Sequence, residues 1–265
     1  MRKKLQSTTL KYLFPVCAIL VLLAVWQLVC MLGVIPNFML PSPADVVGAF
    51  IHDFPNLMHH AFVSVTEALL GLLIGMALAF GLACVMERFL TLEQAVMPLL
   101  VATQTIPTIA IAPLLVLWMG FGMEPKIMLV VITTFFPIAV GLLDGFKSAD
   151  PDAVALLRSM NATRRQIFRH VKMPAALPYF FSGLRISASY AVVGAVISEW
   201  LGGFEGLGVY MTRVRKAYAF DKMFAVILLI VIVSLLLMKL VNVIRDLSMP
   251  WLRYRTEKTQ QLLHE

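Results

Sequence analysis

Charged residues are scarce in this sequence. Asp, Glu, Lys and Arg make up 14% of its 265 residues, hydrophobic residues make up 60%, and the mean hydropathy is +0.86. A soluble domain carries about 25% charged residues, so this composition excludes that class and indicates a membrane protein. Because lipid offers no partner to open backbone groups, helices are expected to cross the bilayer. The predicted fold class is an all-α polytopic membrane protein, formed by one domain over residues 1–265.

Residue patterns that mark enzymes are missing as well. Cys17, Cys30 and Cys84 lie in apolar runs without a CxxC or metal-ligand spacing, which indicates small core or lipid-facing residues. GLLDGFKS (141–148) is not a phosphate-binding loop, since its second Gly falls one position early and a Phe precedes the Lys. We find no metal cluster, nucleophile elbow or paired carboxylates within the apolar segments. No catalytic, metal or cofactor site is predicted.

What the sequence has instead is a series of long apolar runs. The net charge of +7 is typical of cations that flank membrane helices on the cytoplasmic side, and no nucleic-acid partner is implied. With both termini in the cytoplasm, 15 of the 22 Lys and Arg residues fall inside and 5 outside. Windows of membrane-spanning length predict six spans, at about 12–34, 62–86, 95–118, 126–146, 179–200 and 223–245.

The expected outer loops carry two features of interest. The first loop should hold a short helix capped by Ser42, with Pro43 at its first position, and three histidines, His52, His59 and His60, that are either interfacial or metal-binding. The third loop holds four cations and is a candidate contact surface for an external partner. In span two, GLLIG (71–75), continued by Gly81, offers small residues for packing within one subunit or for a dimer interface.

Four residues are candidates for a translocation pathway. Gln104 and Thr105 precede Pro107 in span three, where a proline can unwind a helix and expose carbonyls to a cavity. The alternative is that Gln104 and Thr105 bond a neighbouring helix. Glu199 closes span five beside several glycines and either shapes an outer gate or is a plain interfacial carboxylate.

The stretch DPDAVALLRSMNATRRQIFRHVKMPAALP (150–178) is basic and amphipathic and joins two spans. Asp150 followed by Pro151 is a typical helix start, and Asn161 tolerates the left-handed conformation that closes a helix. Thr163 and Gln166 then form a capping box for a second helix.

Pro174 and Pro178 are expected to break that second helix before span five. The loop is interpreted as two short helices joined by a tight turn at the cytoplasmic surface. A lipid-surface helix is one alternative, and a protein partner is the other. The internal turn favours the protein partner, because binding to head groups does not require a fixed bend.

The loop resembles the "EAA" loop of permease subunits of bacterial ATP-binding-cassette importers. The family spacing of Glu-Ala-Ala, Gly and Ile-x-Leu-Pro is matched without insertion by Ala155, Leu156, Leu157, Asn161, Val171, Met173 and Pro174. Ala155 stands where the family has Glu, Leu157 where it has the second Ala, and Asn161 where it has Gly. Stretches at 104–122, 135–145, 182–203 and 206–211 resemble the branch serving nitrate, sulfonate, taurine and thiamine-precursor pyrimidines.

The resemblance, over about residues 12–250, implies an inner-membrane permease subunit whose loop 150–174 inserts into a cytoplasmic ATPase. ATP-driven closure would then swing two permease subunits, expected to form a homodimer, between inward-open and outward-open states. The implied partners are ATP-binding subunits, an extracytoplasmic substrate-binding protein, a second permease subunit and the lipid bilayer. The implied coupling residues are Asp152, Ala155, Leu157, Met160, Asn161, Ile167, Phe168 and Pro174.

The expected cargo is a thiamine-precursor pyrimidine or a related vitamin, with sulfonate, taurine or nitrate as the alternative. This rests on the stretch SEWLGGFEGLGVYM (198–211) and on neutral polar residues, where an anion would call for a cation: Gln104, Thr105, Thr108, Thr133 and Thr134. The rival class is a secondary transporter, which would require a relay of intramembrane carboxylates or an inverted repeat. Neither is visible in the sequence.

Overall fold

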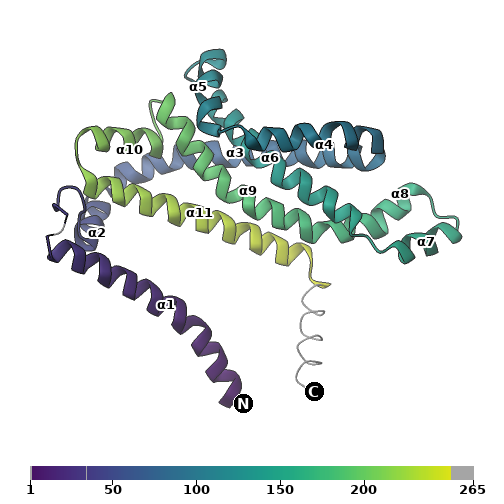
Figure 1. Cartoon of the computed structure of the whole chain (residues 1–265), viewed down its shortest axis with the longest axis horizontal. Helices are drawn as coiled ribbons and strands as arrows, with labels where there is room; N and C mark the ends of the chain where they lie inside the picture. Colours follow the sequence, from purple (N-terminus) through teal and green to yellow (C-terminus); the bar gives the residue numbers. More distant parts are fainter. Residues whose placement is uncertain (1, 34, 252–265) are drawn as a thin grey trace.

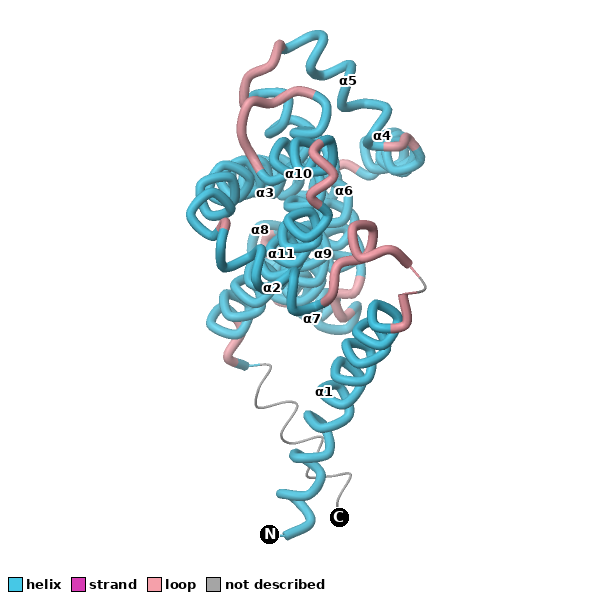
Figure 2. The backbone as a smooth tube through the Cα atoms, turned by 90° about the vertical axis from the view of Figure 1, so that its left-hand side faces the viewer, coloured by secondary structure: helices cyan, strands magenta, loops and turns pink. Residues whose placement is uncertain are grey.

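The computed structural model describes residues 2–33 and 35–251, and this part of the chain contains helices and loops but no strand (Figures 1 and 2). The predicted all-α class is therefore confirmed. In chain order the elements are α1 (Arg2–Met31), α2 (Pro43–His52), α3 (Phe54–Arg88), α4 (Leu90–Thr105), α5 (Thr108–Met119), α6 (Glu124–Lys147), α7 (Pro151–Ser159), α8 (Arg164–Ile167), the π-helix η1 (Phe168–Lys172), α9 (Met173–Leu201), α10 (Leu207–Lys216) and α11 (Phe220–Ser248).

Helices α3, α6 and α9 form the centre of the molecule, and small residues let them approach closely. A Cβ on Gly71 would lie 2.5 Å from the Val130 side chain, and one on Gly75 would lie 2.5 Å from Thr134 Oγ1. The predicted packing of the GLLIG face within one subunit is thus confirmed. A Cβ on Gly81 would meet no neighbour within 4 Å, so this glycine lies outside that contact.

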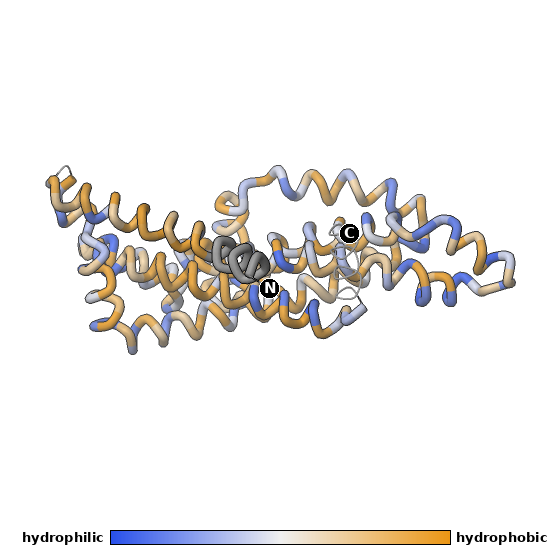
Figure 3. The backbone as a smooth tube through the Cα atoms, turned by 90° about the horizontal axis from the view of Figure 1, so that it is seen from below, coloured by the Kyte–Doolittle hydropathy of each residue, from blue (hydrophilic) through white to orange (hydrophobic). Residues whose placement is uncertain are grey.

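Five helices in the described residues are long and apolar enough to cross a membrane, and a bent pair brings the number to six. Most of the residues along the long helices are hydrophobic, as the orange colour in Figure 3 shows. The expected third span at 95–118 is not one helix. It consists of α4 and α5, which meet at an angle of 98° across Ile106 and Pro107. The backbone is extended at both residues, because Pro107 disfavours helical geometry before it and lacks an N–H to donate.

The end of the molecule that contains α2 and α10, called here the α10 end, lies opposite α7 and α8 (Figure 1). Helix α2 begins as predicted: Ser42 and Asp45 form a capping box and Pro43 occupies the first turn. Helix α3 begins at Phe54, earlier than the expected residue 62, since Pro55 suits its first turn. His59 and His60 therefore belong to the first turns of α3, and their place outside the membrane stays a prediction.

The loop between α6 and α9 contains the predicted helix, turn and second helix. Asp150 caps α7 by accepting from Asp152 N at 2.9 Å, and Asn161 has a φ of 58°. Thr163 and Gln166 make both bonds of the capping box that starts α8.

The expected break at Pro174 and Pro178 is wrong, because α8, η1 and α9 form one continuous helix, Arg164–Leu201. Met173 N donates to Phe168 O across the wide π turn, and Pro174 follows in the first turn of α9. Helix α1, by contrast, stands apart from the bundle, with 6% of its apolar window buried (Figure 1).

Candidate functional site

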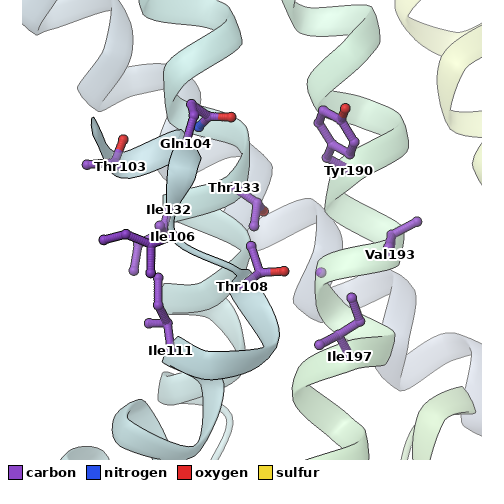
Figure 4. Close-up of a pocket in the computed structure, with 11 residues that line it drawn as sticks. Thr103, Gln104, Ile106, Thr108, Ile111, Ile132, Thr133, Tyr190, Val193 and Ile197 are labelled. Carbon is purple, nitrogen blue, oxygen red and sulfur yellow. The ribbon is translucent and has the colours of Figure 1, made fainter. Parts of the chain in front are cut away.

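A pocket of about 190 Å³ lies where α4 and α5 meet α6 and α9 (Figure 4). The bend at Pro107 turns the last residues of α4 and the first of α5 toward this space. A Cβ on Gly194 would lie 3.1 Å from Thr133 Oγ1, so the glycine leaves room beside that hydroxyl. The lining residues are Thr103, Gln104, Ile106, Thr108, Ile111, Ile132, Thr133, Tyr190, Val193, Gly194 and Ile197.

The lining of this pocket is polar but uncharged. Thr103 and Thr133 donate their hydroxyl protons to carbonyls of their own helices, at 2.6 and 2.9 Å, which leaves their oxygens as acceptors. Gln104 and Tyr190, on opposite walls in Figure 4, bring an amide and a phenol that both donate and accept. Isoleucines complete the walls. Such a lining suits a small, uncharged molecule with polar edges and an apolar face.

The four predicted pathway residues are distributed unevenly around this pocket. Gln104 lines it, and Pro107 lies in the bend that creates it. Thr105 donates to Ala102 O at 2.8 Å in its own helix and does not line the pocket. Glu199 lies elsewhere, near the α10 end. Tyr190 was missed, because a lone tyrosine among small residues of a long apolar helix has no spacing that predicts a pocket.

Glu199 belongs to a network that holds the first turn of α10. It is 1% exposed, so the alternative of a plain interfacial carboxylate is wrong, and a role in shaping an outer gate stays a prediction. Its Oε1 accepts from Ser64 Oγ at 2.6 Å, and its Oε2 accepts from Gly208 N at 2.6 Å. Leu207 N donates to Ser64 Oγ, and Gly206 N donates to His60 Nδ1.

The loop between α6 and α9 presents some of its predicted coupling residues and encloses others. Met160 is 69% exposed, whereas Ile167 is buried at 6% exposure and Phe168 packs on Phe146. Asp152, Ala155 and Asn161 are exposed, and Leu157 and Pro174 are partly buried.

Leu156, which was not among the predicted coupling residues, is exposed beside Met160. The signal that could have identified it was its place in the loop, since Leu156 stands at the first Ala of the family's Glu-Ala-Ala spacing.

Two ion pairs hold the base of this loop. Lys172 Nζ lies 2.5 Å from Glu87 Oε1 at the end of α3, and Lys147 Nζ lies 2.5 Å from Glu93 Oε1 in α4. The loop's second helix is thus tied to α3, while α4 is tied to the end of α6. In Figure 1, α7 and the turn after it lie at the tip of the loop, away from the bundle.

The α10 end carries exposed cations beside a cavity. Arg213, Arg215 and Lys216 are exposed on α10, and a cavity of about 600 Å³ extends from Arg213 and Lys216 to Phe121 and residues 199–204. The fourth cation of the expected loop, Lys222, has its Nζ 3.4 Å from Asp53 Oδ2.

Asp53, between α2 and α3, binds Tyr210 of α10 and Lys222 of α11 and so connects three parts of this end. Partial burial acts to raise its pKa, but the Tyr210 hydroxyl that donates to it and the Lys222 ammonium outweigh burial and hold the pKa below its usual value. Burial and the Asp53 carboxylate raise the pKa of the Tyr210 phenol. Tyr210 therefore stays protonated and donates to Asp53.

Comparison with known proteins gives consistent matches over most of the chain. Residues 68–254 match the family described as "Binding-protein-dependent transport system inner membrane component". A probable ABC transporter permease protein of Haemophilus influenzae is 37% identical over 246 residues, covering 93% of this chain and 97% of that protein. The formylaminopyrimidine transport permease protein ThiX of Halalkalibacterium halodurans is 35% identical over 240 residues, covering 89% and 95%.

Among solved structures, an inward-facing form of the MetNI methionine ABC transporter superposes with a TM-score of 0.63. The match covers 72% of this chain and 94% of that chain, at 19% identity. At this identity the likeness concerns the fold, which the two chains share.

Proposed function

The chain belongs to the family of binding-protein-dependent transport system inner membrane components and is a permease subunit of an ABC importer, and we propose that its cargo is a small uncharged heterocycle. It is a multi-pass inner-membrane protein, and ATP is hydrolysed in separate subunits, so the chain is not itself an enzyme. The family implies ATP-binding subunits and a substrate-binding protein as partners. A thiamine-precursor pyrimidine represents the proposed cargo best.

One observation carries this proposal: the pocket at the α4–α5 bend has hydroxyl, amide and phenol groups but no charged side chain in its lining. A pyrimidine offers ring nitrogens and exocyclic groups to Gln104 and Thr108, and a flat face to Tyr190. Sulfonate, taurine and nitrate carry negative charge, and a passage fitted to them would gain from a cation at this place. The similarity to a formylaminopyrimidine permease supports the same cargo.

Uptake by cells that carry this permease with its ATPase and binding protein tests the cargo. Radiolabelled formylaminopyrimidine is expected to enter in an ATP-dependent manner, to be lost when the permease is deleted, and to be unaffected by excess taurine, alkanesulfonate or nitrate. Uptake of one of those anions without a pyrimidine signal overturns the proposal.

Variants locate the cargo in the pocket. Gln104→Ala and Tyr190→Ala should each lower uptake by about tenfold, which corresponds to the loss of one hydrogen bond or ring contact of about 1.4 kcal/mol. Thr105→Ala is the matched control, since the Thr105 side chain bonds its own helix and does not line the pocket. Equal losses in all three variants would argue against a pocket that contacts cargo.

For coupling, we propose that α7 and the turn after it insert into the ATPase. The exposed apolar side chains of Leu156 and Met160 supply a surface that a groove can bury, and the ion pairs at Glu87 and Glu93 hold the base of the loop. Ile167 and Phe168 then pack against the rest of the permease and anchor the loop to the bundle. The implied contact at the family's Glu is absent, because Ala155 occupies that position.

The proposed arrangement places both termini and the α7–α8 loop in the cytoplasm and α10 outside. The cation count supports this orientation. The exposed cations of α10 then face the substrate-binding protein, and an acidic surface on that protein would match them. A second copy of the chain is proposed to complete the pathway, since α4 and α5, which contribute to the pocket lining, lie on one side of the bundle (Figure 1).

A further inference from the structure

Three charged side chains from three central helices meet inside the bundle near the α10 end. Glu67 of α3 and Glu199 of α9 are each 1% exposed, and Lys126 of α6 is 5% exposed. Lys126 Nζ lies 2.7 Å from Glu67 Oε1. Ser64, which lies one turn before Glu67 on α3, donates its hydroxyl to Glu199 Oε1 at 2.6 Å, so the Glu199 carboxyl group lies against this turn of α3. Neither the pocket at the bend nor the proposed coupling loop uses this cluster.

The charges of this cluster do not balance without a proton. Two carboxylates face one ammonium group, and Glu67 Oε2 is a buried oxygen without a donor among the described residues. Adjacent carboxylates in a low-dielectric interior do not both ionise, because each disfavours the charge of the other. One proton between Glu67 and Glu199 removes the excess charge and gives Glu67 Oε2 the hydrogen bond that it lacks.

The same carboxylate of Glu199 holds the first turn of α10. The first N–H groups of a helix have no partner within the helix, and α10 has no side-chain cap of its own. The amides of Gly206, Leu207 and Gly208 donate instead to His60, Ser64 and Glu199. Gly206 has a φ of 118°, and a Cβ on Gly208 would lie 2.9 Å from Glu199 Cβ, so the two glycines permit this approach.

We propose that Glu67 and Glu199 hold one proton between them, and that this shared proton keeps the first turn of α10 docked on α3 and α9. Without the proton, the cluster contains a second negative charge that is stable only where water reaches it. The cavity of about 600 Å³ beside Glu199 supplies that water from the α10 side. Opening along this side separates α10 from Ser64 and Glu199. The first turn of α10 is thus a latch that opens as the pH rises.

Other titratable groups around the cluster act differently. His60 of α3 accepts from Gly206 N, so protonation of its Nδ1 would release Gly206 as the pH falls, which is the opposite direction. His59 and Glu205 pair at the surface, and Arg213 and Lys216 of α10 line the cavity that reaches Glu199. Helix α5, which also packs on α9, has no titratable side chain. The sign of the pH effect therefore separates the carboxyl pair from His60.

Amide hydrogen exchange of the full chain in lipid nanodiscs tests the latch. The protection of the Gly208 amide, corrected for the intrinsic pH dependence of exchange, should fall as the pH rises, by up to about tenfold per pH unit for one proton. Glu67→Gln places an N–H where the proton lies and keeps an oxygen for Lys126. This variant should keep Gly208 protected at every pH.

Glu67→Ala removes one of the two carboxylates, which leaves one carboxylate and one ammonium group, so that no proton is needed to balance the charges. The protection of the Gly208 amide should then no longer depend on pH, while core amides of α6 remain protected in a folded chain. Glu124→Gln is the matched control, because Glu124 is an exposed acid at the start of α6. Its pH profile should equal that of the unmodified chain.

The proposal is overturned if Gly208 protection in the unmodified chain does not depend on pH. It is equally overturned if Glu67→Gln has the same pH profile as the unmodified chain. A loss of protection that grows only as the pH falls would assign the effect to His60 and contradict the shared proton. None of these outcomes depends on the identity of the cargo.

Discussion

The ring of Phe168 packs against the ring of Phe146, with the two centroids 5.2 Å apart. This contact turns the second helix of the α6–α9 loop toward the bundle, and Ile167 is buried beside it. The apolar residues that remain available to a partner are therefore in α7 and the turn after it. The two halves of the loop have different roles: one anchors and the other extends.

Met160→Asp tests the extended half. Met160 is exposed, so the variant should fold, but a charge forced into a buried contact with the ATPase should lower co-purification of the ATPase by tenfold or more, at about 1.4 kcal/mol per factor of ten. Met160→Leu keeps an apolar side chain of similar volume and is the control. Wild-type co-purification and uptake with Met160→Asp would exclude α7 as the docking element.

Ile167→Asp should behave differently, since it places an unpaired charge inside this chain. A cost of about 3 kcal/mol or more is expected, and the melting temperature of the purified permease should fall before any effect on coupling can be measured. A variant that keeps its melting temperature and loses only the ATPase would show that Ile167 faces the partner instead.

Gly71→Ala tests the contact between α3 and α6. The added methyl group would overlap Val130, and overpacking of this kind costs about 1–3 kcal/mol, which should lower the melting temperature of the purified chain. Gly81→Ala is the matched control on the same helix, because its Cβ meets open space. It should leave the melting temperature unchanged or slightly higher, and equal effects at the two positions would contradict the close packing at Gly71.

Asp53 makes the stability of the α10 end depend on pH under acidic conditions. Its pKa is held below the usual value in the folded chain, so its contribution to stability is present above the pKa of an unfolded Asp, about 3.9, and is lost as the pH falls through the folded value. The melting temperature should therefore fall below about pH 4. In Asp53→Asn this part of the acid dependence should disappear. If the melting temperature of the variant depends on pH as that of the unmodified chain does, Asp53 does not contribute to the acid dependence.

Orientation is tested at two positions. A cysteine introduced by Asn56→Cys, near the start of α3, should react with a membrane-impermeant maleimide added outside, in a chain whose native cysteines are replaced by serine. A reporter fused after Glu265 should be active in the cytoplasm. Labelling of the Asn56→Cys thiol only after lysis, or an external reporter, would reverse the proposed topology.

Local signals in the sequence predicted much of this molecule. Capping residues such as Ser42 and Asp150 act on their own helices, and the left-handed Asn161 needs no distant partner, so short patterns were sufficient. The bend at Pro107 was visible as a proline, but its angle of 98° depends on what α4 and α5 pack against. The continuity of α8 with α9 was missed because Pro174 was expected to end the helix, whereas the π turn before it accommodates the proline.

The buried cluster was out of reach because its members are far apart in the chain. Glu67, Lys126 and Glu199 lie on three different helices, and each alone was consistent with an exposed residue near the end of a span. No expected span contains two carboxylates, so no pair was visible in the sequence. The pairing appears only once α3, α6 and α9 are packed, since Ser64 and Gly208 then place Glu199 beside Glu67.

The central claim is that this chain forms the membrane passage of an importer driven by ATP in partner subunits. Its most direct test is uptake into proteoliposomes that contain the permease, its ATPase and the loaded binding protein. With ATP supplied on the ATPase side and no ion gradient, labelled pyrimidine should accumulate, and collapsing proton and sodium gradients should have no effect. Accumulation that requires an ion gradient and proceeds without ATP would contradict the account and indicate a secondary transporter.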